Sequence, residues 1–207
     1  MISSEGVRLG EQAARDLAQT GRCELGPGLT DAEFSRIERQ FGFEFSEDHR
    51  AFLAAGLPLN GPIPDEPGVI HAYARPWPDW RDGTPEELRE ALDWPGRGVL
   101  FDVDREFNGY WHDDWGRRPE SRAEAVEAAR AFLASVPRMV PVYGHRYLPA
   151  GRGTYGHPVL SMWQTDIIYY GYDLVDYVAH EFGGQGTSRG DARRTPQATV
   201  PFWRDFV

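Results

Sequence analysis

The chain has 207 residues, a net charge of −10 and 41% hydrophobic residues, so it is long and apolar enough to fold around a packed core rather than stay disordered. The negative charge argues against nucleic acid and anionic membranes as partners, because both are themselves negative, and it favours a basic protein partner. No apolar stretch approaches the length of about 20 residues that spans a bilayer.

The N-terminus and the cysteine content favour a cytoplasmic protein. The sequence MISSEGVRLGEQAARDL lacks the basic region and following apolar run of a secretory signal. Cys23 is the only cysteine, which excludes an internal disulfide framework and a multi-cysteine zinc site. We therefore expect a soluble cytoplasmic protein without a cofactor.

The first third of the chain is predicted to be helical. An apolar stripe at helical spacing predicts a helix over residues 9–22. Thr30 followed three residues later by Glu33 is a capping box, and it predicts a second helix that ends at Gly42. A third, short helix is expected over 47–55.

The middle of the chain mixes irregular and regular segments. Residues 57–83 are rich in Pro, Gly and Trp and are expected to be irregular, apart from a short strand at 69–73. The sequence TPEE from Thr84 provides a cap, a proline and two acids, and it predicts a helix to about Leu92. The alternating apolar residues of GVLFDVD predict a strand over 98–104.

The last third is predicted to hold a helix, several strands and a closing helix. The expected elements are a helix from Ser121 through Leu133, strands at 139–144, 157–163 and 166–171, a helix at 174–182 and an aromatic tail at 200–207. Helices come first, strands late and a helix last, which is typical of a single α+β domain over 1–207.

His145, His157 and Asp166 are the first candidate site, because imidazole and carboxylate groups are common metal ligands. The two histidines are twelve positions apart, however, and no compact ligand motif is present. The simpler interpretation is that HRYLPAGRGTYGHP is a loop between strands, and that its histidines hold the loop rather than a metal.

WHDDWGRRP (111–119) is the second candidate site. His112, Asp113 and Asp114 suggest an acid–base group, with Arg117 and Arg118 as an anion clamp. Adjacent residues point in different directions, so the alternative is a turn in which an aspartate caps the backbone while Trp111 and Trp115 pack on the core. No nucleophile elbow or phosphate loop is present.

The segment LTDAEFSRIERQFGFEFSEDHRAFLAAG resembles the N-terminal motif of the SUKH superfamily, the cell-wall-assembly-regulator-like proteins. In that motif a helix leads through a glycine turn with alternating hydrophobic residues and a proline into Tyr-x-x-Phe-Leu. The corresponding residues here are Ile37, Phe41, Gly42, Phe43, Phe45, Ser46, His49, Phe52 and Leu53. Ser46 replaces the usual proline and His49 the usual tyrosine.

The strand-rich half resembles bacterial SUKH members more loosely. VLFDV, the Trp-Gly of DDWGRRP, MVPVYGHRYLP and PVLSMWQTDIIYYGYDLVDYV carry this part of the resemblance, which spans residues 29–182. Residues 1–28, an insertion at about 60–95 and the tail at 184–207 lie outside it.

The resemblance implies an antiparallel-rich sheet with helices packed mainly on one side, and a non-catalytic role. Bacterial relatives are commonly immunity proteins that neutralise toxins, many of them nucleases. An acidic inhibitor suits a basic nuclease surface, which the charge of −10 matches. Family likeness is a fold-level argument, so function still has to be argued from a site.

We therefore expect a protein that occludes a basic partner, with a toxin domain as the candidate. The predicted surface uses Asp113, Asp114 and Asp166 as acids and Trp111, Trp115 and Tyr169 as aromatic anchors. Two alternatives stay open. One is a metal-assisted hydrolase that uses His145, His157 and Asp166, and the other is a housekeeping scaffold or small-ligand binder.

Overall fold

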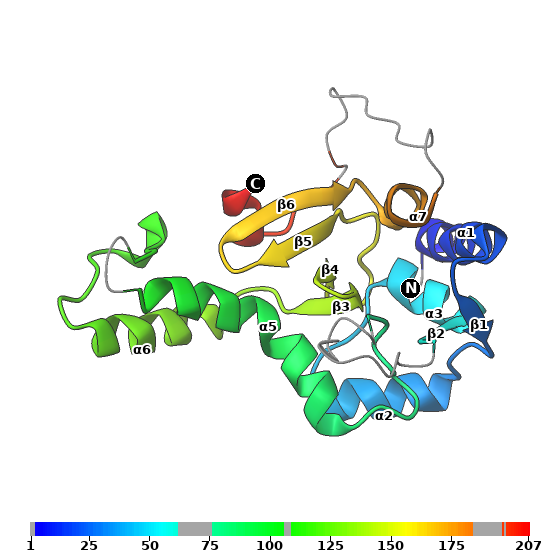
Figure 1. The fold of residues 1–207 in the computed structure, drawn as a ribbon, viewed down its shortest axis with the longest axis horizontal. Coiled ribbons are helices and arrows are strands. Elements are labelled where there is room, and N and C mark those ends of the chain that lie inside the picture. The colour runs from blue at the N-terminus through cyan, green and yellow to red at the C-terminus, as the bar shows by residue number, and fades with distance from the viewer. Residues whose placement is uncertain (1–2, 62–75, 106–108, 184–195, 197) are drawn as a thin grey trace, which may run out of the picture.

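The computed structural model describes residues 3–61, 76–105, 109–183, 196 and 198–207, and the fold in this part of the chain is α+β, as expected (Figure 1). The helices are α1 (Ser4–Thr20), α2 (Asp31–Phe41), α3 (Glu47–Ala55), α5 (Pro85–Val103), α6 (Arg122–Leu133) and α7 (Leu174–Phe182). The strands are β1 (Glu24–Gly26), β2 (Leu57–Leu59), β3 (Met139–Tyr143), β4 (Arg146–Pro149), β5 (Val159–Trp163) and β6 (Asp166–Gly171). Two short 3-10 helices are η1 (Asp113–Trp115) and η2 (Trp203–Phe206).

The strands form two antiparallel sheets. One has the order β3-β4-β5-β6, and the other pairs β1 with β2. The predicted strands at 139–144, 157–163 and 166–171 are confirmed as β3, β5 and β6, and the predicted helix at 174–182 is confirmed as α7. The expected strand at 69–73 lies outside the described residues.

The segment from His145 to Pro158 is only partly a loop. Its first residues form β4, which pairs with both β3 and β5, so the prediction of a plain connection between strands was wrong there. Pro149 closes β4 opposite Met139. β1 and β2, each only three residues long, were also missed.

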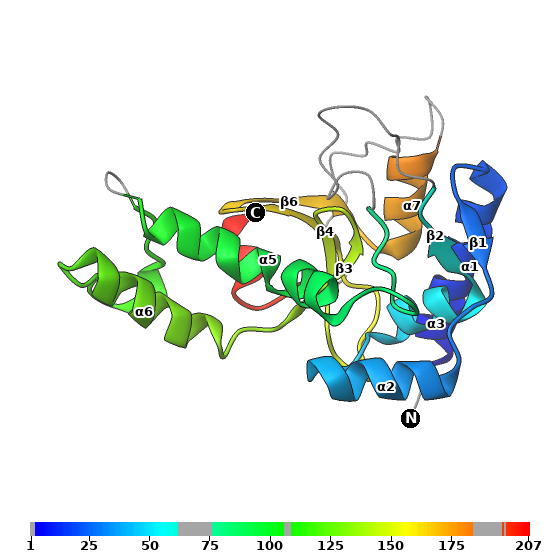
Figure 2. The same cartoon turned by 60° about the horizontal axis from the view of Figure 1, so that its bottom comes forward.

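Buried apolar residues form two clusters. The first contains residues of α1, α2, α3 and α7, with Leu88 and Leu92 of α5. The second contains Val99 and Val103 at the other end of α5, together with residues of α6, β5, β6 and the tail. Figures 1 and 2 show the second half of α5 beside α6 at one end of the molecule, with α1, α3, β1 and β2 at the other. Within the described ranges, no helix is long and apolar enough to cross a bilayer.

The predicted strand over 98–104 was wrong, because α5 continues to Val103. Val99 and Val103 are both fully buried, whereas Phe101 is 59% exposed. A strand would place Phe101 on the same face as the two valines, but a helix separates it from them. Together with Leu88 and Leu92, the valines continue one buried stripe at helical spacing.

Pro95 lies inside α5, where its missing N–H leaves the carbonyl of Ala91 without its usual helical donor. The hydroxyl of Tyr147 on β4 donates to that carbonyl at 2.9 Å. The tertiary contact therefore replaces the lost helical bond. The helix changes direction along its length (Figure 1), as expected for a helix with an internal proline.

Candidate functional site

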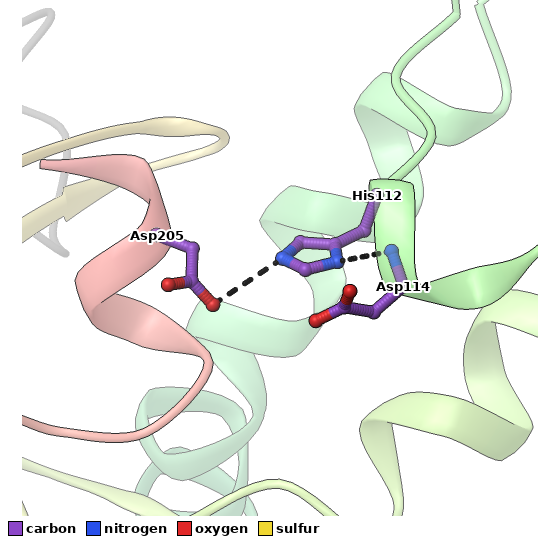
Figure 3. Close-up of side chains that lie close together, drawn as sticks. All are labelled: His112, Asp114 and Asp205. Atoms are coloured by element: carbon purple, nitrogen blue, oxygen red, sulfur yellow. Dashed lines mark hydrogen bonds and ion pairs between the residues drawn. The ribbon is translucent and has the colours of Figure 1, made fainter.

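His112, Asp114 and Asp205 form a cluster that we call the acidic group. Each residue offers a nitrogen or oxygen that could bind a metal, and these atoms all lie within 4.8 Å of one another. No other set of three or more histidine, cysteine or carboxylate side chains in the described part of the chain meets this distance. His112 precedes η1, Asp114 lies in η1 and Asp205 lies in η2. Figure 3 shows the carboxylates of Asp114 and Asp205 approaching the imidazole of His112 from these two elements. The segments that contain η1 and η2 are more than 90 residues apart in the sequence, and they meet at this group of polar side chains.

The hydrogen bond to the ring of His112 indicates the tautomer of the neutral imidazole. Its Nδ1 accepts a hydrogen bond from the backbone N–H of Asp114 at 3.2 Å, so Nδ1 has no proton, and the neutral ring carries its proton on Nε2. Nε2 lies 3.5 Å from Oδ2 of Asp205. This places a ring N–H opposite a carboxylate in a side chain that is 9% exposed.

This arrangement does not fit a metal ion as it stands. A histidine that binds a metal through one nitrogen usually donates the proton of the other to an acceptor. Here the other nitrogen, Nδ1, already faces an N–H donor. Binding a cation through Nε2 would set two N–H groups against each other, so the ring would have to turn first.

Aromatic rings surround the acidic group. Trp115 is buried and stacks on Phe132 at 5.6 Å and on Phe202 at 5.9 Å, measured between ring centroids. Phe206 packs against Tyr110 at 5.2 Å. Burial, followed by the negative charges of Asp113 and Asp205, raises the pKa of Tyr110 to about 12. The exposed carboxylates therefore border an apolar cluster of rings and place a negative potential at Tyr110.

The predicted partner residues of the 111–115 segment differ in exposure. Asp113 and Asp114 are exposed, as the prediction requires, and Trp111 is half-buried, with its indole N–H donating to the carbonyl of Gly116 at 2.7 Å. Trp115 is only 7% exposed and belongs to the second core cluster. It therefore packs the interior in this structure and does not present its ring to a partner.

The predicted partner residues on β6 lie on opposite faces of the strand. Asp166 is exposed at the start of β6, beside Trp163 of β5. Tyr169 is half-buried against the second core cluster. Because successive strand residues point to opposite faces, Asp166 and Tyr169 do not form one patch by themselves. η2 contacts β6 and so connects this strand to the acidic group.

The alternative metal ligands His145, His157 and Asp166 are not brought together, because they do not form a group within 4.8 Å. His145 packs edge-on against Trp163 at 5.9 Å. Burial lowers the pKa of His157, while the negative charge of Asp48 raises it. The Nδ1 of His157 is buried without a hydrogen-bond partner among the described residues, so the expectation that this histidine holds the loop stays a prediction.

The proposed anion clamp is not assembled either. Arg117 pairs with Glu120 at 3.4 Å and is exposed, and Arg118 donates to the carbonyl of Val103 at 2.9 Å. The turn interpretation of 111–119 is confirmed, but its cap is the imidazole of His112 rather than an aspartate.

Asp205 is the site residue that sequence reasoning missed. It lies in the aromatic tail at 200–207, and no sequence motif links it to His112. The one available signal was the concentration of aromatic residues in VPFWRDFV, which is unusual for an unpacked terminus. Trp203 and Val200 of this tail are each 2% exposed.

The seven tryptophans are divided between core and surface. Trp77, Trp80, Trp115 and Trp203 are buried, Trp94 and Trp111 are half-buried, and Trp163 is 41% exposed. Most of the rings therefore fill the interior, and Trp111 and Trp163 remain as the candidates for a contact surface.

No protein-family model matches this sequence, and comparisons with curated proteins and with solved structures give no match. The class that the structure defines is an α+β protein with two antiparallel sheets and an acidic group set among aromatic rings.

Proposed function

We propose that the chain is a non-catalytic protein-binding module that occludes a basic protein through an acidic–aromatic surface. This surface consists of Tyr110, Trp111, Asp113, Asp114, Asp205 and Phe206. The observation that carries the proposal is that carboxylates from two distant segments gather around aromatic rings at one point of the fold.

The chemistry of the surface favours arginine or lysine in the partner. Asp113 and Asp114 are exposed and Asp205 is 41% exposed, so all three can reach a cation. Guanidinium groups form charge-assisted hydrogen bonds with carboxylates and also stack on aromatic faces. The net charge of −10 adds long-range attraction that speeds the encounter. Asp166 is exposed at the start of β6, the strand that η2 contacts, and is a further acid that a partner could reach.

The more specific form of the proposal is an immunity protein of the SUKH type. The support is the motif over residues 29–53 together with the acidic charge. The partner would then be a toxin domain with a basic surface, for which a nuclease is the leading candidate, because a surface that binds phosphates is basic.

The test is a capture experiment with the tagged full-length chain in lysate of the native host, at low and at high salt. The decisive variant is Asp113→Asn with Asp114→Asn, which removes two charges from the surface. A matched control, Glu5→Gln with Glu11→Gln, removes two exposed charges from α1 in the other half of the molecule.

The proposal is supported if the wild type holds a basic protein at low salt and releases it at high salt. The Glu variant should retain that protein, and the Asp variant should lose it. With that protein purified, the Asp variant should slow association about tenfold and reduce its salt dependence. Equal binding by the two double variants would show that net charge alone, and not this surface, holds the partner.

The alternative is a metal-assisted hydrolase centred on the acidic group, which supplies three candidate ligands. The orientation of His112 argues against it. Elemental analysis of the purified protein decides between the two: stoichiometric zinc or manganese that His112→Ala abolishes, in a protein that stays folded, would overturn the non-catalytic proposal.

A further inference from the structure

The C-terminal strap, defined here as Val200–Val207, is attached to the rest of the molecule by side chains. Each backbone hydrogen bond that the described residues give the strap is internal to it, as between Arg204 N–H and the carbonyl of Val200 at 2.9 Å. The indole N–H of Trp203 donates to the carbonyl of Pro137 at 2.8 Å. His112 faces Asp205 at 3.5 Å. The strap can therefore detach without breaking any strand pairing.

The backbone of the strap is strained where it enters η2. Phe202 has φ 67° and ψ −58°, and the N–H of Trp203 bonds to the carbonyl of Pro201 at 2.8 Å. This is a γ-turn with positive φ at its centre, the rarer and more strained of the two γ-turn forms. A phenylalanine occupies that conformation only where its surroundings hold it there.

Those surroundings are the rings of His112 and Trp115, which lie directly beside the acidic–aromatic surface. The Phe202 ring lies 5.1 Å from the His112 ring and stacks on Trp115 at 5.9 Å, while Phe206 packs on Tyr110. Packing of the strap and formation of the acidic group are therefore one event. When the strap leaves, Asp205 is removed from the acidic group and Trp115 loses a stacking partner.

We infer that the strap is a releasable latch that assembles the acidic–aromatic surface when it docks and dismantles it when it opens. Its role in partner binding rests on the proposed function, but its opening does not, and the two can be measured separately. A partner that binds the docked form holds the latch closed. Opening breaks no backbone hydrogen bond between the strap and the rest of the described fold, but it takes Val200 and Trp203 out of the second core cluster, and this loss of burial sets its cost.

The experiment is native-state hydrogen exchange on the full chain, followed by NMR at several urea concentrations below the unfolding transition. The indole N–H of Trp203 and the amide of Asp205 report on the latch. The amide of Met162, which bonds to the carbonyl of His145 at 2.9 Å, reports on the sheet.

We expect the latch protons to exchange at least about tenfold faster than the Met162 amide and with little dependence on urea, because a local opening exposes little surface. The same rate and the same urea dependence for all three protons would show that the strap opens only with global unfolding, and would overturn the inference.

A matched pair of variants tests the strain directly. Phe202→Ala and Phe202→Gly both remove the ring, so the loss of packing is shared, but only glycine accepts the positive φ freely. The Trp203 indole proton should exchange about fivefold faster in the alanine variant than in the glycine variant. Equal exchange, or faster exchange in the glycine variant, would contradict a strained latch.

Discussion

Glu33 offers the sharpest quantitative prediction, because the described helices include two nearly identical capping boxes and only one of these two has a charged partner in the described residues. Glu33 accepts hydrogen bonds from the N–H and the hydroxyl of Thr30 at 2.7 and 2.8 Å. It also accepts from Nε of Arg81 at 2.6 Å. Glu87 makes the same two bonds to Thr84, at 3.2 and 2.9 Å, and has no ion pair in the described part of the chain.

The expected loss of unfolding free energy follows from this difference in partners. Replacing Glu by Gln keeps the shape of either capping box and weakens it by about 0.5 kcal/mol. At Glu33 the change also removes a charge-assisted bond to Arg81, which in turn donates to the carbonyls of Pro27 and Gly28 at 3.0 Å. A bond to a charged group contributes about 1.5–3 kcal/mol, and less when it is partly exposed to solvent. We expect Glu33→Gln to cost about 2 kcal/mol and Glu87→Gln about 0.5 kcal/mol.

The stability that Glu33 contributes depends on pH, and the sign of this dependence follows from its pKa. The bond from Arg81, followed by the two bonds from Thr30, lowers the pKa of Glu33 from 4.5 to about 2. Because the folded pKa is the lower one, the stabilisation is present above about pH 4.5 and is lost as the pH falls towards about 2. The difference between wild type and Glu33→Gln should therefore shrink steadily over that interval.

Urea denaturation of the wild type and the two variants, at about pH 6 and about pH 3, measures these differences in unfolding free energy. The extra stability is assigned to the pair of Glu33 with Arg81. Equal losses of unfolding free energy in Glu33→Gln and Glu87→Gln would refute this assignment, and so would a loss for Glu33→Gln that is the same at both pH values.

Two further predictions concern packing. Gly10→Ala should lower the free energy of unfolding by about 2 kcal/mol or more, because the added Cβ would collide with the backbone carbonyl of Asp48 where α1 crosses α3. In Gly96→Ala of α5 the added Cβ meets no atom within 4 Å, so the free energy of unfolding should stay the same or rise by up to about 1 kcal/mol. Thermal unfolding compares the two, and equal shifts would contradict the close helix contact. Trp115→Ala should cost about 3–5 kcal/mol because the ring is buried, whereas Trp163→Ala should cost about 1 kcal/mol; similar costs in urea denaturation would mean that Trp115 is not a core residue.

Elements with local signals were predictable from the sequence. The capping box at Thr30 and the cap, proline and acids from Thr84 predict the start of α2 and α5, which the structure confirms. The helix predicted over 47–55 is confirmed as α3, although the side chain of its N-cap residue Ser46 makes no capping bond. Strand β6 and helix α7 have the predicted bounds. These features depend on residues within a few positions of one another, so the sequence contains the whole interaction.

The tertiary structure alone decided how α5 and the acidic group form. Pro95 and the alternation in GVLFDVD favour a break and a strand, but the hydroxyl of Tyr147, 56 positions away from Ala91, supplies the bond that the proline removes. Asp205 reaches His112 only because the tail packs on the second core cluster. In both cases the deciding partner is distant in the chain, and local propensity contains no information about which distant groups the packed core will bring together.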